Sequence, residues 1–200
     1  MRTGQKIAAL VLTVVVLAGG VGAAIVSTSA GSGNPDGGRA ASGPLLIRPA
    51  HGWAAPAEVG ETFVDGTEQL FTTQGEATLV KVEIEGDSAI SLVGSRVAGS
   101  TREFASVQYL DSWPVTDPGL GPIASSEGAV FSTREADAKG IELLVAMKLE
   151  KPGHFLRKGL WITYEADGVT HRDFIPAELT MCSADFVVDG ECPFLGQGAD

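Results

Sequence analysis

Side chains that often carry chemistry are scarce in this sequence, which has two cysteines and three histidines among its 200 residues. Cys182 and Cys192 are not spaced as Cys-x-x-Cys, so neither a thioredoxin-type redox motif nor a zinc knuckle is indicated. His154 and His171 fall at opposite ends of one expected strand, which makes a shared metal site geometrically poor. We therefore predict that the protein binds no metal and no other cofactor.

Recognisable catalytic motifs are also absent from the sequence: there is no GxSxG elbow, HExxH, P-loop, SxxK or GxGxxG fingerprint. Glu83 and Glu85 share one face of an expected strand, and such a carboxylate pair can carry acid–base or glycosidase chemistry. A pair of this kind is more commonly the solvated face of a strand. We predict a non-catalytic protein. The alternatives are an extracytoplasmic hydrolase with an unrecognised site and a secreted metal-handling protein.

Positive charge is in short supply, with 14 Lys and Arg against 25 Asp and Glu and a net charge of −11. The imbalance is steeper after Arg48, where 10 basic residues face 24 acidic ones. A surface this acidic repels nucleic acid and anionic lipid headgroups. We predict no nucleic-acid partner; cationic partners, or solubility alone, fit the charge better.

Charge is missing altogether from residues 7–26, which read IAALVLTVVVLAGGVGAAIV. A helix of about twenty residues is about 30 Å long and matches the hydrocarbon core of a bilayer. Arg2 and Lys6 precede it, and basic flanks stay on the cytoplasmic side. The pattern predicts a cytoplasmic segment over 1–6, a transmembrane signal-anchor over 7–26, and a single-pass protein of the cell membrane whose remainder is extracytoplasmic.

Two features follow the apolar segment. Thr28 and Ala30 suit a signal-peptide cleavage site, so secretion after cleavage is the alternative to a membrane anchor. Residues 27–44 are rich in Ser, Gly, Ala and Pro and predict a flexible linker, because such a composition buries too little apolar surface to offset its ordering entropy. Residues 45–200 are long enough for one domain with a hydrophobic core.

Alternation of apolar and polar residues dominates this domain, and a period of two predicts half-buried strands of an antiparallel sheet. The expected inward residues are Val80, Val82 and Ile84 in one strand, Ile141, Leu143, Val145, Met147 and Leu149 in another, and Leu160, Ile162 and Tyr164 in a third. Turn-forming pairs separate the strands, at Asp65-Gly66, Glu85-Gly86, Pro118-Gly119, Pro152-Gly153 and Asp167-Gly168. Short strands with frequent turns predict an all-β antiparallel β-sandwich.

The segment 149–182 reads as strand, Pro-Gly turn, strand, Asp-Gly hairpin and strand. This order resembles the last strands of immunoglobulin-like domains in bacterial exported proteins, which implies an immunoglobulin-like sandwich after the single N-terminal helix. In that resemblance Tyr164 takes the place of the tyrosine-corner residue. The layout of the whole chain is similar to uncharacterised membrane-anchored proteins of high-GC Gram-positive bacteria, a resemblance that implies no particular activity.

The two cysteines lie in the C-terminal segment LTMCSADFVVDGECPF. An even cysteine count in an extracytoplasmic chain favours a disulfide. Asp189-Gly190 between Cys182 and Cys192 favours a tight turn that would bring the two sulfurs together. The loop-closure entropy of so short a loop corresponds to about 2.5–3 kcal/mol of stabilisation. We predict a Cys182–Cys192 disulfide that pins the C-terminal tail onto the last strand.

Two tryptophans stand in segments expected to be loops, where recognition residues often lie. Trp53 follows the linker, and Trp113 lies in the loop 111–122 with Asp111 and Asp117. These four residues are the candidate contact surface; the alternative is that both indoles pack over the ends of the sandwich core. Together the features predict a recognition or accessory module, attached to the membrane by its N-terminal helix, for an envelope or membrane protein partner.

Overall fold

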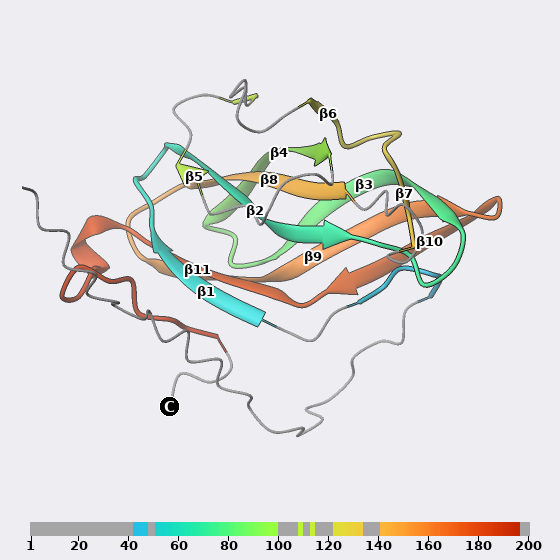
Figure 1. The fold of residues 1–200 in the computed structure, drawn as a ribbon. Coiled ribbons are helices and arrows are strands. Elements are labelled where there is room, and N and C mark those ends of the chain that lie inside the picture. The colour runs from blue at the N-terminus through green and yellow to red at the C-terminus, as the bar shows by residue number, and fades with distance from the viewer. Residues whose placement is uncertain are drawn as a thin grey trace, which may run out of the picture. The chain divides into compact units, whose positions relative to one another are not determined.

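The computed structural model describes residues 42–47, 51–99, 108–109, 113–114, 122–133 and 141–196. This part of the chain is all-β, and its two sheets form a sandwich (Figure 1). The predicted fold class is confirmed at this level. The predicted membrane span, residues 7–26, lies outside the described residues, within which no helix is long and apolar enough to cross a membrane.

The first sheet has six strands and contains the last strands of the chain. Its order is β1 (His51–Pro56), β11 (Ala177–Cys182), β9 (His154–Ala166), β3 (Glu76–Gly86) and β7 (Val130–Ser132), with β10 (Val169–Ile175) also paired to β9. Strands β1 and β11 run parallel, whereas the other pairs are antiparallel. The first strand of the described domain therefore lies beside the last.

The second sheet has five strands. Its order is β5 (Gln108–Tyr109), β2 (Thr62–Leu70), β8 (Ile141–Leu149), β4 (Ile90–Gly99) and β6 (Ile123–Ser125). A short 3-10 helix, η2 (Ala184–Phe186), follows β11. Because β2 belongs to one sheet and β3 to the other, the chain crosses the sandwich early, and each sheet combines strands from both halves of the domain.

The main hydrophobic core lies between the sheets and is built by the alternating residues of β8 and β9. Leu143, Val145, Met147 and Leu149 from β8 are buried together with Leu160, Ile162 and Tyr164 from β9. The predicted inward residues of these two strands are thereby confirmed, with Ile141 partly buried at the edge of the core.

The alternation predicted that β8 would be half-buried. Its second face is nevertheless buried as well. Leu144 and Ala146 form a smaller cluster with Val64 and Ala98 on the outer side of the second sheet, and Trp113 and Ile123 pack against it. The sequence pattern failed here because Trp113 and Ile123, which are distant in sequence from β8, pack on a face that alternation alone assigns to solvent.

The prediction that Val80 of β3 points inward is also wrong. Val80 is 40% exposed, while Leu79 and Val82 are buried. The pairing of β3 with β9 shifts register between Leu79 and Lys81, which is a β-bulge. An extra residue in one strand moves the following side chains to the opposite face, so Val80 does not share the buried side of Val82.

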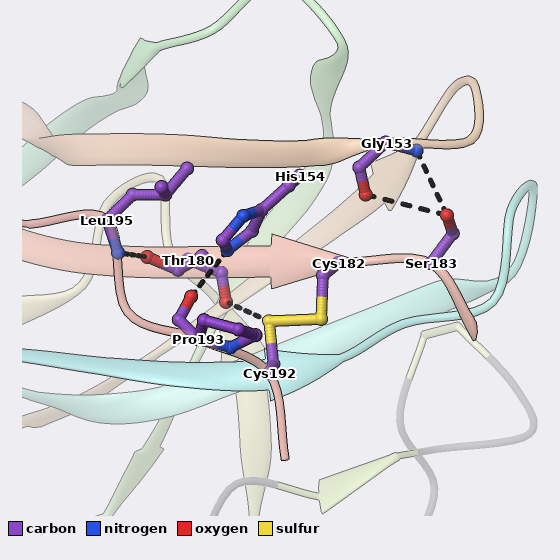
Figure 2. The surroundings of a disulfide bond; sticks show 8 residues. All are labelled: Gly153, His154, Thr180, Cys182, Ser183, Cys192, Pro193 and Leu195. Carbon is purple, nitrogen blue, oxygen red and sulfur yellow. Dashed lines mark hydrogen bonds between the residues drawn. A yellow bond between two sulfur atoms is a disulfide. The ribbon is translucent and has the colours of Figure 1, made fainter. Parts of the chain in front are cut away.

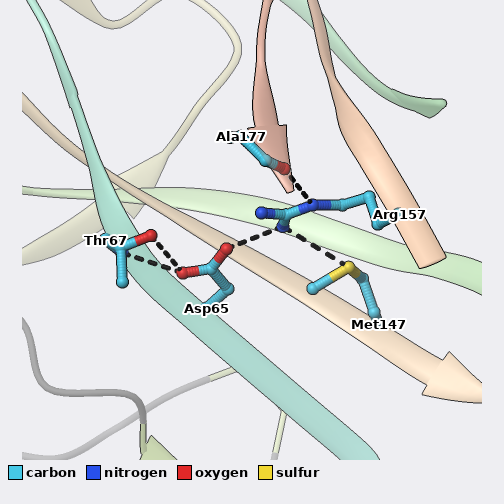
Figure 3. A network of polar contacts seen from close by, with 5 residues as sticks. All are labelled: Asp65, Thr67, Met147, Arg157 and Ala177. Carbon is cyan, nitrogen blue, oxygen red and sulfur yellow. Dashed lines mark hydrogen bonds and ion pairs between the residues drawn. The ribbon is translucent and has the colours of Figure 1, made fainter. Parts of the chain in front are cut away.

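Asp65-Gly66 was predicted to form a turn, and this prediction is wrong. Both residues lie within β2, where a register shift between Asp65 and Glu68 marks a bulge. Asp65 is fully buried and accepts hydrogen bonds from the amide (2.9 Å) and hydroxyl (2.7 Å) of Thr67. Its other oxygen lies 2.7 Å from the buried guanidinium of Arg157 (Figure 3). The carboxylate is drawn inward by a charged partner that the local sequence does not reveal.

The segment before β1 is held against the sandwich by Tyr164. The Tyr164 hydroxyl donates to Asp173 Oδ2 (2.6 Å) and accepts from the Leu45 amide (3.1 Å), 119 residues earlier in the chain. Ser42 contributes its amide to Asp173 Oδ1, and its carbonyl accepts from His171 Nδ1 (3.0 Å). A tyrosine corner bonds backbone only a few residues upstream, so Tyr164 has a different role: it fixes the point where the N-terminal segment joins the domain.

The residue between these contacts, Gly43, shows how closely the segment is held. A Cβ at Gly43 would lie 2.5 Å from the His171 ring and 2.6 Å from the Tyr164 hydroxyl. Leu45 is 2% exposed and completes the core beside β2. Burial and the hydrogen bond to Asp173 raise the pKa of the Tyr164 phenol well above its ordinary value, so the hydroxyl stays a donor.

Candidate functional site

The C-terminal tail covers the outer side of the first sheet near β11 (Figure 2). Cys182 and Cys192 form the predicted disulfide, with Cα atoms 5.9 Å apart. The predicted turn at Asp189-Gly190 is also confirmed: both residues have positive φ, 53° and 86°, and Val188 and Glu191 pair across them. A turn of this kind needs two left-handed residues in succession, which Asp-Gly adopts readily.

Beyond the disulfide the tail continues to make contacts with the sheet. The Leu195 amide donates to Thr180 Oγ1 (2.9 Å), and His154 Nε2 hydrogen-bonds the Pro193 carbonyl. Phe194 packs on Gly52 of β1 so closely that a Cβ there would lie 2.2 Å from its ring. The outer face of the first sheet is thus covered at its β1–β11 end.

Strands β3, β9 and β10 lie side by side in the same sheet, and their outward side chains are exposed or half-buried. Trp161 of β9 is paired with Glu83 of β3 on one side and with Phe174 of β10 on the other. The ring centroids of Trp161 and Phe174 are 5.2 Å apart, within the range of an aromatic pair. Two half-buried aromatic rings therefore lie at the centre of this sheet face.

Gly159 explains how the Phe174 ring can lie beside Trp161. A Cβ at Gly159 would lie 2.5 Å from the Phe174 ring and 2.3 Å from the Ile175 carbonyl oxygen. Only the absence of a side chain on this position of β9 lets the Phe174 ring extend across the strand. The aromatic pair is therefore fixed by β-sheet backbone and a glycine.

Charged side chains surround the two rings. The Arg172 guanidinium carbon lies 4.1 Å from the Trp161 ring centroid, a cation–π contact, and Arg172 Nη2 lies 3.4 Å from Glu83 Oε2. Lys81 Nζ lies 2.9 Å from Glu83 Oε1. This hydrogen bond, with the positive charges of Lys81 and Arg172, lowers the pKa of Glu83 below its ordinary value. Glu85 accepts a hydrogen bond from the Trp161 indole N–H.

We call this surface the β9 face. It includes the outward residues Lys81, Glu83, Glu85, Trp161, Glu165, Arg172 and Phe174, together with Lys158, Thr163 and Thr170. It combines a rigid backbone, two aromatic rings and charges of both signs. Tryptophan, arginine and aromatic residues on an ordered scaffold are the side chains that contribute most to protein–protein contacts. Within the described part of the chain, no group of three or more His, Cys, Asp or Glu is arranged to hold a metal ion.

The two tryptophans predicted to be part of a contact surface lie outside the β9 face. Trp53 is half-buried and packs against the core, with its ring centroid 5.6 Å from that of Phe63. Trp113 covers the smaller cluster, and a Cβ at Gly94 would lie 3.0 Å from its Nε1. Asp111 and Asp117 lie outside the described residues. A role of these four residues in binding stays a prediction, and the structure does not bring the two tryptophans into the β9 face.

Trp161 and Phe174 were missed by the sequence analysis, although a signal for them exists. The predicted Asp167-Gly168 turn is confirmed, with φ of 52° and 75°, and it joins β9 to β10 as a two-residue hairpin. In such a hairpin, residues equally distant from the turn lie opposite each other. Trp161 and Phe174 are each six residues from the nearer turn residue, so their pairing follows from the turn alone.

Comparison with known proteins adds no family to this description. No model of a protein family matches the chain, and no curated protein matches it.

Proposed function

We propose that the chain is a non-catalytic recognition or accessory module that acts outside the cell membrane and binds an envelope or membrane protein through the β9 face. The observation that carries the proposal is the Trp161–Phe174 pair, held half-exposed on three paired strands at a centroid distance of 5.2 Å. Rings fixed in this way lose little conformational entropy on binding, which favours affinity.

The outer faces of the two sheets differ in how far they are covered, and this difference supports the β9 face as the binding surface. Trp113 and Ile123 of β6 pack against the outer cluster of the second sheet, and the disulfide-bonded tail packs over β11. Leu144 and Ala146 of the second sheet and Cys182 of β11 are buried. Trp161 and Phe174 of the β9 face are instead only half-buried, and apolar side chains gathered on one sheet face and partly open to solvent are typical of an interaction site.

An immunoglobulin-like topology is part of the proposal. The strand order β2-β8-β4 in one sheet and β11-β9-β3 in the other parallels the B-E-D and G-F-C orders of that fold. The parallel pairing of β1 with β11 agrees with it. The order departs from the usual one where β7 returns to pair with β3 after β4 has entered the other sheet.

The extracytoplasmic location rests on the sequence and on chemistry. The uncharged segment 7–26, preceded by Arg2 and Lys6, supports a single span or an export signal. The Cys182–Cys192 disulfide suits an oxidising compartment. Protease accessibility of the C-terminal domain in intact cells, compared with lysed cells, tests the location. Protection from protease in intact cells and cleavage after lysis would contradict an extracellular domain.

Photo-crosslinking from defined positions tests the binding surface. A photoreactive amino acid replaces Thr170, an exposed outward residue of β10 that is paired with Glu165, in the full-length protein in its own cells. The control position is Val93, which is 38% exposed on β4 of the other sheet. We expect a discrete crosslinked species from position 170 and none from position 93. Equal crosslinking from both positions, or none from either, would contradict a recognition role for the β9 face.

A further inference from the structure

We infer that the segment recognised by the β9 face is a basic stretch of polypeptide, rich in arginine and lysine, whose cationic side chains contact Trp161 and the carboxylates beside it. This inference rests on the proposed function and specifies the partner.

Trp161 already binds a guanidinium within its own chain. Arg172 lies over the ring with its guanidinium carbon 4.1 Å from the ring centroid, and Glu83 holds the same guanidinium from the side. This arrangement shows that the ring and a neighbouring carboxylate together suit an arginine head. Phe174, 5.2 Å from Trp161 between centroids, offers a second ring beside the first. Aromatic faces of this kind attract cations through their quadrupole.

Two carboxylates of the face are left without a cationic partner in the described part of the chain. Glu83 is shared by Lys81 and Arg172, whose side chains lie 2.9 Å and 3.4 Å from its two oxygens. Glu85 accepts the Trp161 N–H, and Glu165 is exposed; among the described residues neither carboxylate is paired with a cation. The whole chain carries a net charge of −11. Both the face and the field around it therefore favour a cationic partner and disfavour a second copy of this chain.

The spacing of the free carboxylates favours an extended segment over a small cation. Glu85 is paired with Gly159, and Glu165 lies six residues further along β9. At about 3.3 Å per residue, the two carboxylates are separated by roughly 20 Å along the strand, with Trp161 between them. Several cationic side chains of one polypeptide can span that length, whereas a single ammonium or guanidinium group contacts only one carboxylate.

Binding of a labelled ten-residue arginine peptide to the full chain tests the inference. The site variant carries Glu85→Gln and Glu165→Gln, and the control variant carries Asp189→Asn and Glu191→Gln. Both remove two exposed negative charges, but the control charges lie in the disulfide-closed loop. We expect the site variant to weaken binding about tenfold and the control variant less than about threefold, where tenfold corresponds to about 1.4 kcal/mol. Trp161→Leu in the otherwise unchanged chain is expected to weaken binding by a similar factor to the site variant.

Four outcomes would overturn the inference. The first is that the wild-type chain binds no peptide, and the second is that both charge variants weaken binding equally. The third is that Trp161→Leu leaves the affinity unchanged, and the fourth is that spermine displaces the peptide at an equal concentration of charge. Equal weakening identifies attraction by net charge alone, and displacement by spermine identifies a site for small cations. Thermal unfolding of each variant checks that the fold is retained. Crosslinking from position 170 to a partner that shows no dependence on basic residues would leave the proposed function standing while this inference fails.

Discussion

Arg157 of β9 and Asp65 of β2 form an ion pair between the two sheets, with 2.7 Å between Nη1 and Oδ2 (Figure 3). Their side chains are 1% and 0% exposed. Arg157 Nε also donates to the Ala177 carbonyl (3.1 Å) of β11, and Thr67 supplies two hydrogen bonds to Asp65. One charged contact thus joins strands of both sheets in the interior of the sandwich.

Removing one partner of this pair is expected to destabilise the protein strongly. Asp65→Asn leaves the buried Arg157 guanidinium without a counter-charge, and Arg157→Met does the same to the Asp65 carboxylate. Each should lower the free energy of unfolding by about 3–5 kcal/mol. The control Lys158→Met, at an exposed neighbouring position, should change it by less than about 0.5 kcal/mol. Urea denaturation of the full chain measures all three. Losses below about 1 kcal/mol for both core variants would show that water reaches the pair.

The double variant Asp65→Asn with Arg157→Met, which combines the two single substitutions, separates the pair from its individual groups. Because a buried ion pair roughly balances its own desolvation, the double variant should lose less stability than the sum of the single variants. The coupling free energy from the double-mutant cycle is expected to exceed about 1 kcal/mol, as for other contacting buried groups. Strict additivity would contradict a direct interaction between Asp65 and Arg157.

The disulfide should matter locally as well as globally. Replacing Cys182 and Cys192 together by alanine removes the constraint on a loop of 10 residues in sequence separation. Loop entropy then predicts a loss of about 2.5–3 kcal/mol in unfolding free energy. Hydrogen exchange should also show faster exchange of the Leu195 amide, which is bonded to Thr180 Oγ1. An unchanged exchange rate would mean that the tail is held by its other contacts and does not need the disulfide.

Tyr164 gives the protein a predicted alkaline sensitivity. The folded state keeps the Tyr164 pKa raised, whereas the unfolded phenol ionises near pH 10. Below about pH 10 the Tyr164 phenol is protonated in the folded and the unfolded state, and its contribution to the free energy of unfolding is fully present. Above about pH 10 the unfolded state loses this proton first, so the free energy of unfolding falls by up to about 1.4 kcal/mol per pH unit. Tyr164→Phe should lack this additional decrease. Parallel stability curves of the two proteins between about pH 9 and 12 would contradict the assignment.

The same residue should control the attachment of the N-terminal segment. Tyr164→Phe removes a donor to the buried Asp173 carboxylate and should cost about 1–3 kcal/mol. Gly43→Ala places a Cβ 2.5 Å from the His171 ring and should displace the segment without altering the core strands. We expect faster exchange of the Leu45 amide in both variants. An unchanged exchange rate of the Leu45 amide in Gly43→Ala would show that the segment accommodates the added methyl group, which would contradict the close packing around Gly43.

The elements that the sequence predicted well are those determined by neighbouring residues. The alternation in β9 placed Leu160, Ile162 and Tyr164 correctly, because the extra residue of the bulge beside Tyr164 lies in β3 and the alternation of β9 itself continues. Asp167-Gly168 and Asp189-Gly190 form turns because each supplies two residues that adopt positive φ at low cost. The cysteines were assigned to each other because ten residues and a tight turn let them meet.

What the sequence could not give depends on distant parts of the chain. Asp65-Gly66 is a bulge and not a turn because Arg157, far along the sequence, binds the carboxylate. Val80 is exposed because the strand it pairs with shifts register there. The outer side of β8 is buried because Trp113 packs over it. Each of these depends on which strands become neighbours, and local periodicity contains no information about that choice.

The most direct test of the β9 face as a recognition surface is the crosslinking yield from position 170 when the aromatic pair is removed. Trp161→Thr with Phe174→Thr preserves strand-forming residues while deleting both rings, and Val169→Thr, at a 54% exposed position, is the matched control. We predict loss of the discrete crosslinked species in the double variant and full yield in the control, with thermal unfolding confirming that both proteins are folded. An undiminished yield from a folded double variant would contradict the account.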